Sequence, residues 1–216
     1  MNSEEKEIIK ALNKLGVDTR FISLSDDGIY INNLKFSKFS RRKEEKFRSE
    51  YPQIKVIRSK LFQKICIKVS RTIKNQIKPK QTLYIEDDSS LESKLLYILL
   101  EPYRRKYGIS ITHNKQDNGT MVKKDCLTDF TIHYINLMIN AQQITDKREK
   151  NTICPLAQVP REWILDWAET DNVNYTKHGG DEKTISTDIL EFLEEHIPNV
   201  QESIRQSVYY LDKNKQ

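Results

Sequence analysis

Apolar residues recur along this chain at two spacings, and the two spacings predict helices and strands in different places. Recurrence every three to four residues predicts helices over residues 3–15, 55–78, 91–107, 129–142, 160–169, 185–196 and 200–211. Short alternating or β-branched runs predict strands over residues 19–24, 28–36, 82–86, 109–113 and 151–156. Beyond residue 79 strands and helices alternate, which is the order expected of an α/β domain with a parallel sheet.

The predicted helix over residues 55–78 has one apolar face and one basic face. Seven apolar residues share one broad arc: Ile57, Leu61, Phe62, Ile65, Val69, Ile73 and Ile77. Five cations share the opposite arc: Lys60, Lys64, Arg71, Lys74 and Lys78. Together with Arg41, Arg42 and Lys43 just upstream, this basic face is the candidate surface for binding a nucleic-acid backbone.

Charge is distributed unevenly along the chain. Between Lys35 and Lys80 there are sixteen Lys and Arg against three Glu, a charge of +13, which leaves −8 for the remainder of a chain whose total is +5. A segment this basic on an otherwise acidic protein points to a polyanion, and RNA fits better than a membrane because no strongly apolar amphipathic anchor accompanies it. The alternative is a solvated basic face without a partner.

The overall composition indicates a folded protein outside the secretory route. No apolar run approaches the length needed to span a bilayer and the polar start is no secretory signal, so we expect a cytoplasmic location. Residues 1–54 are expected to form an N-terminal appendage and basic linker, and residues 55–216 the main domain. Cys66, Cys126 and Cys154 lie far apart without a CxxC pair, so neither a disulfide framework nor a zinc site is predicted.

Residues 82–102 carry the strongest candidate chemistry. A short apolar strand runs into an Asp/Ser cluster and directly into an amphipathic helix, which is the layout of a phosphate-binding loop at a helix N-terminus. The candidate nucleotide-binding residues of this loop are Asp88, Ser89, Ser90, Glu92 and Ser93. The alternative is that these carboxylates and serines cap the helix themselves and bind no ligand.

In order, these elements resemble the PP-loop ATP pyrophosphatase family, within it the tRNA-modifying branch of lysidine synthetases, 2-thiocytidine synthetases and cytosolic thiouridylases. Three segments carry the resemblance. The family's Ser-Gly-Gly-x-Asp-Ser motif falls on residues 88–93, its Asp-Asp pair falls on Thr128 and Asp129, and its Pro-Leu segment falls on Pro155 and Leu156. The ordered series over residues 55–211, rather than any single motif, supports the resemblance.

The resemblance implies a three-layer Rossmann-like PP-loop α/β domain, of the adenine nucleotide alpha hydrolase type, with a small N-terminal α+β appendage and a helical C-terminus. It also implies ATP with magnesium in the loop and at Asp129. Ser89 and Ser90 replace both glycines of the motif and the loop is crowded with carboxylates, so we expect ATP binding to be weak or lost. Cys126 and Cys154 lie beside the second and third motifs, as candidate sulfur carriers or as small buried hydrophobes.

This pattern resembles the non-catalytic second subunit of the cytosolic thiouridylase complex. It implies a tRNA-binding protein that supports 2-thiolation of the wobble uridine, in a hetero-oligomer with an active PP-loop paralogue. Two alternatives stay open. One is an active enzyme that adenylates a tRNA base with ATP, for thiolation or lysidine-type transfer, through Asp129 and residues 89–93. The other is an RNA-binding protein without a nucleotide site.

Overall fold

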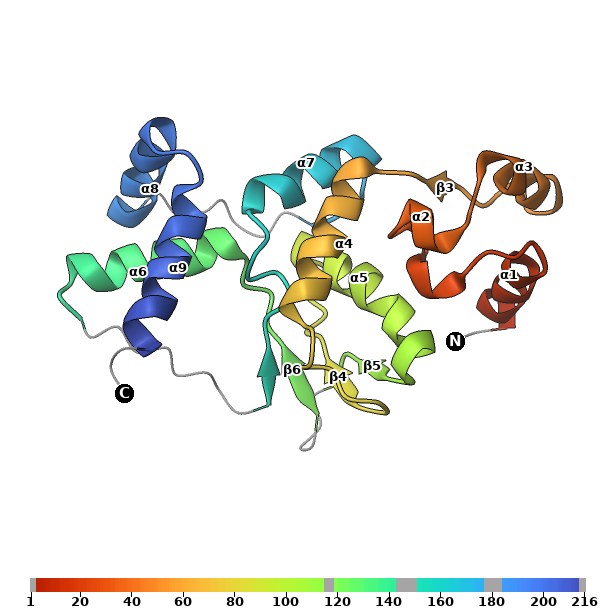
Figure 1. Ribbon diagram of the computed structural model, residues 1–216, viewed down its shortest axis with the longest axis horizontal. Helices are drawn as coiled ribbons and strands as arrows, with labels where there is room; N and C mark the ends of the chain where they lie inside the picture. The colour runs from red at the N-terminus through yellow and green to blue at the C-terminus, as the bar shows by residue number, and fades with distance from the viewer. Residues whose placement is uncertain (1–2, 115–118, 143–150, 177–183, 214–216) are drawn as a thin grey trace.

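The computed structural model describes residues 3–114, 119–142, 151–176 and 184–213, which form two sheets flanked by helices (Figure 1). The N-terminal unit lies at one end of the elongated molecule, a parallel sheet lies near its centre, and the C-terminal helices lie at the other end. Within the described residues no helix is both long and apolar enough to cross a membrane.

The N-terminal unit is built on a three-stranded sheet in the order β1-β2-β3. β1 (Ile22–Ser25) and β2 (Gly28–Ile31) form an antiparallel hairpin, and β3 (Val56–Ile57) pairs parallel to β2. Its helical segments are α1 (Ser3–Lys14), the 3-10 helix η1 (Thr19–Phe21), α2 (Leu34–Ser37) and α3 (Arg41–Glu50). Gly28 is needed beside β3, because a Cβ there would lie 2.3 Å from the Lys55 carbonyl oxygen.

The central unit is a four-stranded sheet in the order β5-β4-β6-β7, and all its pairings are parallel. The strands are β4 (Thr82–Tyr84), β5 (Ser110–Thr112), β6 (Thr120–Val122) and β7 (Thr152–Ile153). Its helices are α4 (Lys60–Thr72), α5 (Leu91–Tyr107), α6 (Leu127–Ile139) and α7 (Arg161–Asp171). The predicted α/β class with a parallel sheet is therefore confirmed.

The C-terminal helices cover α6 at the far end of the molecule. α8 (Ile185–His196) and α9 (Val200–Lys213) pack with it around a small apolar cluster of Ile135, Leu190 and Val200. The predicted helical C-terminus is present, with α8 at its predicted bounds. The apolar spacing within the helix predicted over residues 129–142 placed Met138 and Ile139 inward, but both side chains are exposed on α6.

Three elements of the structure differ from the prediction. The helix expected from residue 55 begins at Lys60, because Val56–Ile57 joins the N-terminal sheet as β3 and Ser59 caps the helix by accepting the Phe62 N–H at 3.1 Å. The strand expected over residues 28–36 ends at Ile31, where Asn33 caps α2. β6 was not predicted, because a three-residue strand has no periodicity and its register comes from pairing with β4.

The N-terminal unit has a hydrophobic core of its own, but Tyr30 and Ile57 of its sheet pack into the core of the central unit. Tyr30 of β2 is fully buried, with its ring 4.9 Å from Phe62 of α4 and 6.0 Å from Trp167 of α7. The division into residues 1–54 and 55–216 stays a prediction, although β3 extends the N-terminal sheet to Ile57. Tyr30 thus packs the N-terminal sheet against α4 and α7.

Candidate functional site

The candidate loop, residues 85–90, joins β4 to α5 at the carboxyl ends of the parallel strands. β5 and β6 flank β4 on opposite sides, so the strand order reverses here. In open α/β sheets this reversal point is where ligands bind. The sequence prediction therefore placed the loop correctly relative to the sheet.

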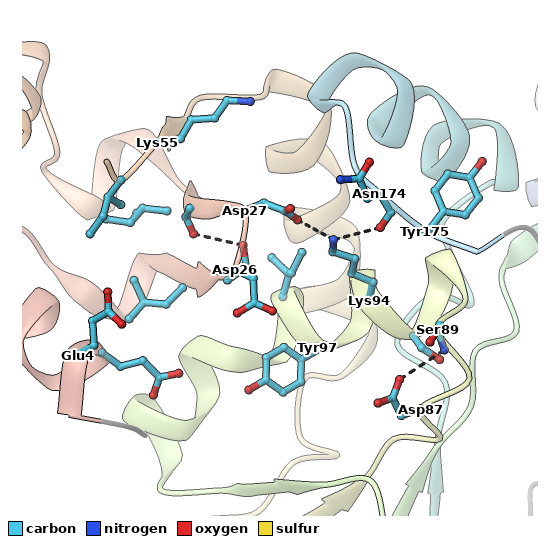
Figure 2. A pocket seen from close by; sticks show the side chains of 18 of the residues that line it. Glu4, Asp26, Asp27, Lys55, Asp87, Ser89, Lys94, Tyr97, Asn174 and Tyr175 are labelled. Atoms are coloured by element: carbon cyan, nitrogen blue, oxygen red, sulfur yellow. Dashed lines mark hydrogen bonds and ion pairs between the residues drawn. The ribbon is translucent and has the colours of Figure 1, made fainter. Parts of the chain in front are cut away.

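The loop satisfies its own backbone N–H groups. Asp87 accepts the Ser89 N–H at 3.4 Å (Figure 2), and Asp88 accepts the Ser90 N–H at 3.1 Å. Ser90 is the N-cap of α5 and accepts the Ser93 N–H at 3.3 Å. The Ser93 hydroxyl in turn lies 2.8 Å from Asp88 and 2.7 Å from the Glu86 carbonyl oxygen. Donors that a phosphate would need are thus held by side chains of the loop.

The backbone of the loop keeps a glycine-like shape at one position. Ser89 has a φ of 60°, in the left-handed region, which costs a residue with a Cβ roughly 1–2 kcal/mol. Ser90 has an ordinary extended φ of −70°. Of the two positions where the resembled motif has glycine, only the first has a conformation that glycine would favour.

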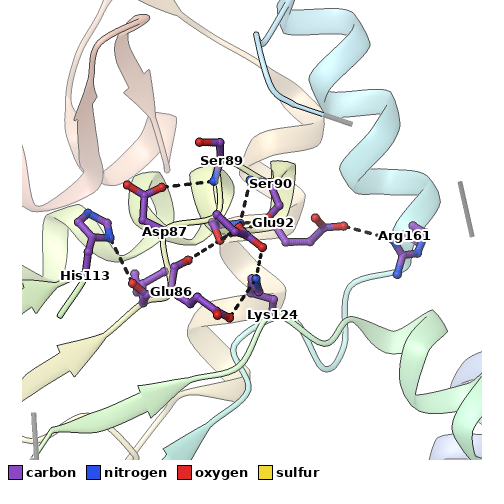
Figure 3. Close-up of polar contacts among 11 residues, drawn as sticks. Glu86, Asp87, Ser89, Ser90, Glu92, His113, Lys124 and Arg161 are labelled. Atoms are coloured by element: carbon purple, nitrogen blue, oxygen red, sulfur yellow. Dashed lines mark hydrogen bonds and ion pairs between the residues drawn. The ribbon is translucent and has the colours of Figure 1, made fainter. Parts of the chain in front are cut away.

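A lysine that follows β6 neutralises part of the loop (Figure 3). Lys124 forms an ion pair with Asp88 and lies 3.4 Å from Glu86. Partial burial alone would raise the pKa of Asp88, but the hydrogen bonds from Lys124, Ser90 and Ser93 outweigh it and hold this pKa far below its usual range. For Lys124, burial opposes the charged form, but Asp88 and Glu86 raise its pKa.

An arginine at the start of α7 joins the other two motif segments to the loop. Arg161 lies 3.2 Å from Glu92 of α5 and also pairs with Asp129 of α6. The second Asp129 oxygen accepts the Cys126 N–H at 2.8 Å, which caps α6. The three segments singled out in the sequence therefore meet in one polar cluster, and Asp129 acts in it as a helix cap and ion-pair partner.

The charge of this cluster is unsuited to a bare polyphosphate. Its carboxylates are Glu86, Asp87, Asp88, Glu92 and Asp129, whereas the cations that pair with them are Lys124 and Arg161. An added triphosphate would be repelled unless divalent cations bridged it. In the described ranges, no three His, Cys, Asp or Glu side chains are arranged to hold a metal ion. The excess of carboxylates over cations therefore disfavours a bare triphosphate, and weak or lost binding of ATP with magnesium stays a prediction.

A large cavity, of about 1000 Å³, opens on the side of the loop that faces the N-terminal unit (Figure 2). Its acidic lining residues are Glu4, Glu5, Asp26, Asp27 and Asp87, against Lys55 and Lys94. Lys94 spans the two units, because its ammonium lies 2.8 Å from Asp27 and donates to the Asn174 carbonyl oxygen at 3.1 Å. No sequence pattern predicts this cavity, since it forms only where the appendage packs on α5.

Sequence reasoning also missed Lys124 and Arg161. Lys124 follows Lys123 in a stretch with no periodic pattern and Arg161 opens a predicted helix, and only the register of β6 and the start of α7 bring the two cations to the loop. His113 also lies beside the loop, with Nδ1 3.1 Å from the Ile85 carbonyl oxygen.

The predicted RNA-binding cations fall into two groups. Lys60, Lys64 and Arg71 are exposed on α4, and Lys74 and Lys78 are exposed in the segment that follows, because the helix ends at Thr72 and not at residue 78 as predicted. Arg41 and Arg42 are exposed at the start of α3, whereas Lys43 donates to the Gly16 carbonyl oxygen at 2.7 Å. Lys64 also lies 5.8 Å from the centre of the Trp163 ring. The structure is thus consistent with the basic face on α4, while its binding of RNA stays a prediction.

Comparison with known proteins relates this chain to a curated protein by sequence and to solved structures by fold. No protein-family model matches the sequence. Over 93 residues, 42% of this chain, the sequence is 37% identical to a probable sulfurtransferase of Methanocaldococcus jannaschii, and this region spans 27% of that protein. The U34-tRNA thiolase NcsA from Methanococcus maripaludis, solved with its 4Fe-4S cluster, matches with a TM-score of 0.54 and 13% identity, over 70% of this chain and 78% of that one. This chain has the PP-loop fold.

The predicted PP-loop fold is therefore confirmed. A likeness at 13% identity establishes the fold, and the chemistry of the site follows from this chain's own side chains. The chain spans about a quarter of the length of its curated relative, so that protein's activity enters here only as a proposal.

The cysteines of this chain do not fit a 4Fe-4S cluster. Cys66, Cys126 and Cys154 all lie in the described ranges and no group of three metal-ligating side chains forms there. Burial, and then the charge of Asp129, raises the pKa of the Cys126 thiol to about 12, and burial also raises the pKa of Cys66. Cluster ligation and sulfur carriage both need a thiolate, which these two environments disfavour.

Replacing Asp88 by asparagine should lower the free energy of unfolding at pH 7 by up to about 1 kcal/mol, because the ion pair with Lys124 is lost. The pKa of Asp88 is depressed in the folded chain, so its charge stabilises the fold above the ordinary pKa of 3.8 and the contribution is lost as pH falls through the folded-state pKa. The difference between wild type and variant in urea unfolding should therefore shrink between about pH 5 and pH 2.

Asp87→Asn is the matched control for this variant. Asp87 accepts a loop N–H as Asp88 does, but it has no ion pair in the part of the chain that the structure describes. A pH-independent effect of Asp88→Asn, equal to that of the control, would contradict the role assigned to Lys124.

Proposed function

We propose that this chain is a tRNA-binding, non-catalytic PP-loop subunit that supports 2-thiolation of the wobble uridine of tRNA, acting in the cytoplasm. The thiolation role is supported by the sequence relationship to a probable sulfurtransferase and by the fold shared with a U34-tRNA thiolase. The non-catalytic role rests on one observation, the self-satisfied loop. The N–H groups of Ser89, Ser90 and Ser93 already have acceptors within residues 87–90.

The energetics of the loop favour this assignment over an active ATP-dependent enzyme. A phosphate would have to displace the Asp87 and Asp88 side chains from these donors, and the displaced carboxylates would then face it. It would also have to compete with Asp88 for Lys124 and with Glu92 and Asp129 for Arg161. Each of these carboxylates already forms an ion pair with the cation that the phosphate would need.

The tRNA-binding part of the proposal rests on α4. One side of this helix packs Phe62, Ile65 and Val69 into the core, and the other presents its cations to solvent. Phosphate contacts from such a helix give affinity and register without base specificity. This chain would therefore bind and orient tRNA while a partner performs the chemistry.

The proposed partner is an active PP-loop paralogue in a hetero-oligomer. Exposed apolar side chains on the C-terminal helices, among them Ile185, Phe192 and Tyr210, offer a surface for it. The rival with an active site in this chain predicts instead that Asp129 and Glu92 are catalytically essential. An RNA-binding protein outside thiolation predicts no effect on thiouridine.

One complementation experiment distinguishes the non-catalytic subunit from the active enzyme and from an RNA-binding protein outside thiolation. Deletion of the gene should abolish 2-thiouridine in tRNA, measured by mass analysis of nucleosides, and the wild-type gene should restore it. The double variant Glu92→Gln and Asp129→Asn keeps side-chain shape and the cap on α6, so under this proposal it should restore 2-thiouridine to near the wild-type level.

Two outcomes would contradict the proposal in different ways. Unchanged 2-thiouridine on deletion would remove the thiolation role. A folded double variant that fails to restore thiolation, together with tight ATP·Mg binding by calorimetry, would make this chain the catalyst.

A further inference from the structure

A second cavity, of about 220 Å³, opens between the N-terminal unit and the helices α4 and α5. One wall of this cavity, called the aromatic groove below, is formed by η1, the end of β2 and α2. The opposite wall is formed by α4, and α5 closes the groove. The residues that decide its chemistry are Arg20, Phe21, Phe36, Ile67, Tyr103 and Lys106. None of its lining residues borders the large acidic cavity, so it is a separate site.

Aromatic side chains dominate this groove and one of them is strongly exposed. Phe36 is 54% exposed, and its ring lies 5.3 Å from that of Phe21. Across the groove, Tyr103 stacks on Tyr107, and the Lys106 ammonium lies 5.7 Å from the first ring and 5.1 Å from the second. Exposed apolar side chains bordered by polar groups mark interaction sites.

The charge of the groove is opposite to that of the large cavity. Among the described residues that line it there is no aspartate or glutamate, and Arg20 and Lys106 supply cations. Arg20 is paired with Asp18 outside the groove. Ile67 of its α4 wall is followed one helical turn later by Arg71, so the groove opens beside the basic face.

Two amide side chains at the groove have hydrogen-bond donors to offer. The Asn32 oxygen accepts the Ser23 hydroxyl at 3.0 Å, and the Asn33 oxygen accepts the Phe36 N–H at 3.0 Å. With both oxygens engaged in the described part of the chain, the Nδ2 groups are the donors left for a ligand. Carbonyl and ring-nitrogen acceptors on the edge of a nucleobase match them.

We infer that this groove binds one unpaired nucleobase of the RNA whose backbone follows the basic face of α4. The inference rests on the proposed tRNA binding and adds a site to it. Phe36 stacks on the face of the base, the Asn32 and Asn33 amides donate to its edge, and Lys106 and Arg71 contact the flanking phosphates. Aromatic stacking with cations and edge hydrogen bonds is how proteins recognise single-stranded RNA.

The test compares a short single-stranded RNA with the same strand paired in a duplex, each labelled and titrated with the full chain in an anisotropy assay. Phe36→Ala should weaken single-strand binding by about tenfold or more, because stacking on an aromatic side chain is lost, and should change duplex binding by less than about twofold. Phe36→Tyr, which keeps an aromatic ring, should bind as wild type. Met138→Ala on α6, at an equally exposed apolar site, is the control for general loss of apolar surface.

Failure of this site and failure of the proposed function give different results. If tRNA binds with steep salt dependence but Phe36→Ala and wild type bind single strands equally, the groove does not bind a base and the proposed function stands. If neither RNA binds, both are wrong. If Phe36→Ala weakens the binding of an acidic peptide but not that of single-stranded RNA, the groove is a protein-binding site and the inference is overturned.

Discussion

Replacement of Glu101 by leucine is expected to lower the free energy of unfolding by about 3–5 kcal/mol, because it leaves the Arg105 guanidinium buried without a counter-charge. Glu101 is 2% exposed in α5, where it pairs with Arg105 and accepts the Leu24 N–H of β1 at 3.1 Å. Arg105 donates to the carbonyl oxygens of Thr19 at 2.9 Å and Ile22 at 2.7 Å. This pair therefore fixes the N-terminal unit to the helix that leaves the candidate loop.

Urea unfolding measures the effect, and two further variants identify its cause. Glu101→Gln keeps an acceptor for Leu24 but loses the charge, so its cost should be intermediate, about 1–3 kcal/mol. The double variant Glu101→Leu with Arg105→Leu removes both charges and should be less destabilised than the two single variants added together. Strict additivity, or a cost below about 1 kcal/mol for Glu101→Leu, would show that the buried pair does not join the units.

Neutralising Lys64, Arg71 and Lys74 together should weaken tRNA binding about a hundredfold at 0.15 M salt. Each phosphate contact contributes roughly 0.7–0.9 to the slope of log affinity against log salt, so three lost contacts reduce the slope by about 2–3. Substitution by glutamine keeps the side chains long and polar on an exposed helix face, so the fold should be unaffected. Titration of labelled tRNA over a series of salt concentrations measures both the affinity and the slope.

A matched triple variant tests whether the effect belongs to α4. Lys6, Lys10 and Lys14 are exposed on α1, and glutamine at these positions removes the same charge. The control should lower affinity only slightly and leave the slope nearly unchanged. An equal effect of both triple variants would mean that net charge, and not the basic face of α4, attracts the RNA.

The loop shows how fold and chemistry separate in this chain. Its position at the end of β4 and its left-handed Ser89 keep the geometry of a phosphate-binding turn. Its side chains provide acceptors where a phosphate would otherwise lie. Selection on such a loop would preserve the structure that positions α5, since the same helix carries Glu101, Arg105 and the wall of the aromatic groove.

Long amphipathic elements were predicted well from the sequence. The bounds of α5 match the prediction because a leucine-rich face runs from the Ser90 cap to Gly108, whose φ of 65° ends the helix. Two short strands were not predicted. β3 lies where a helix was expected and β6 where no element was expected, because their pairing partners rather than their own patterns make these segments strands.

The residues of the candidate site also fall into those that the sequence predicted and those that only the tertiary structure revealed. The Asp/Ser loop and Asp129 stand out in the sequence because residue type and neighbouring periodicity mark a helix N-terminus. Lys124 and Arg161 carry no such mark, and they reach the loop only through the register of β6 and the packing of α7. The aromatic groove is also invisible along the chain, since Phe36 and Tyr103 are 67 positions apart in sequence.

The sequence by itself determined the α/β class, the basic face of α4 and the self-capping character of the loop, because these depend on spacing within one element and on the chemistry of adjacent residues. The tertiary structure decided which cations neutralise the loop, that Glu101 is buried beside Arg105, and that a large acidic cavity and a small aromatic groove open on different sides of the N-terminal unit. These features depend on contacts between residues far apart in the chain. Their free energies come from burial and pairing across elements, which no local pattern encodes.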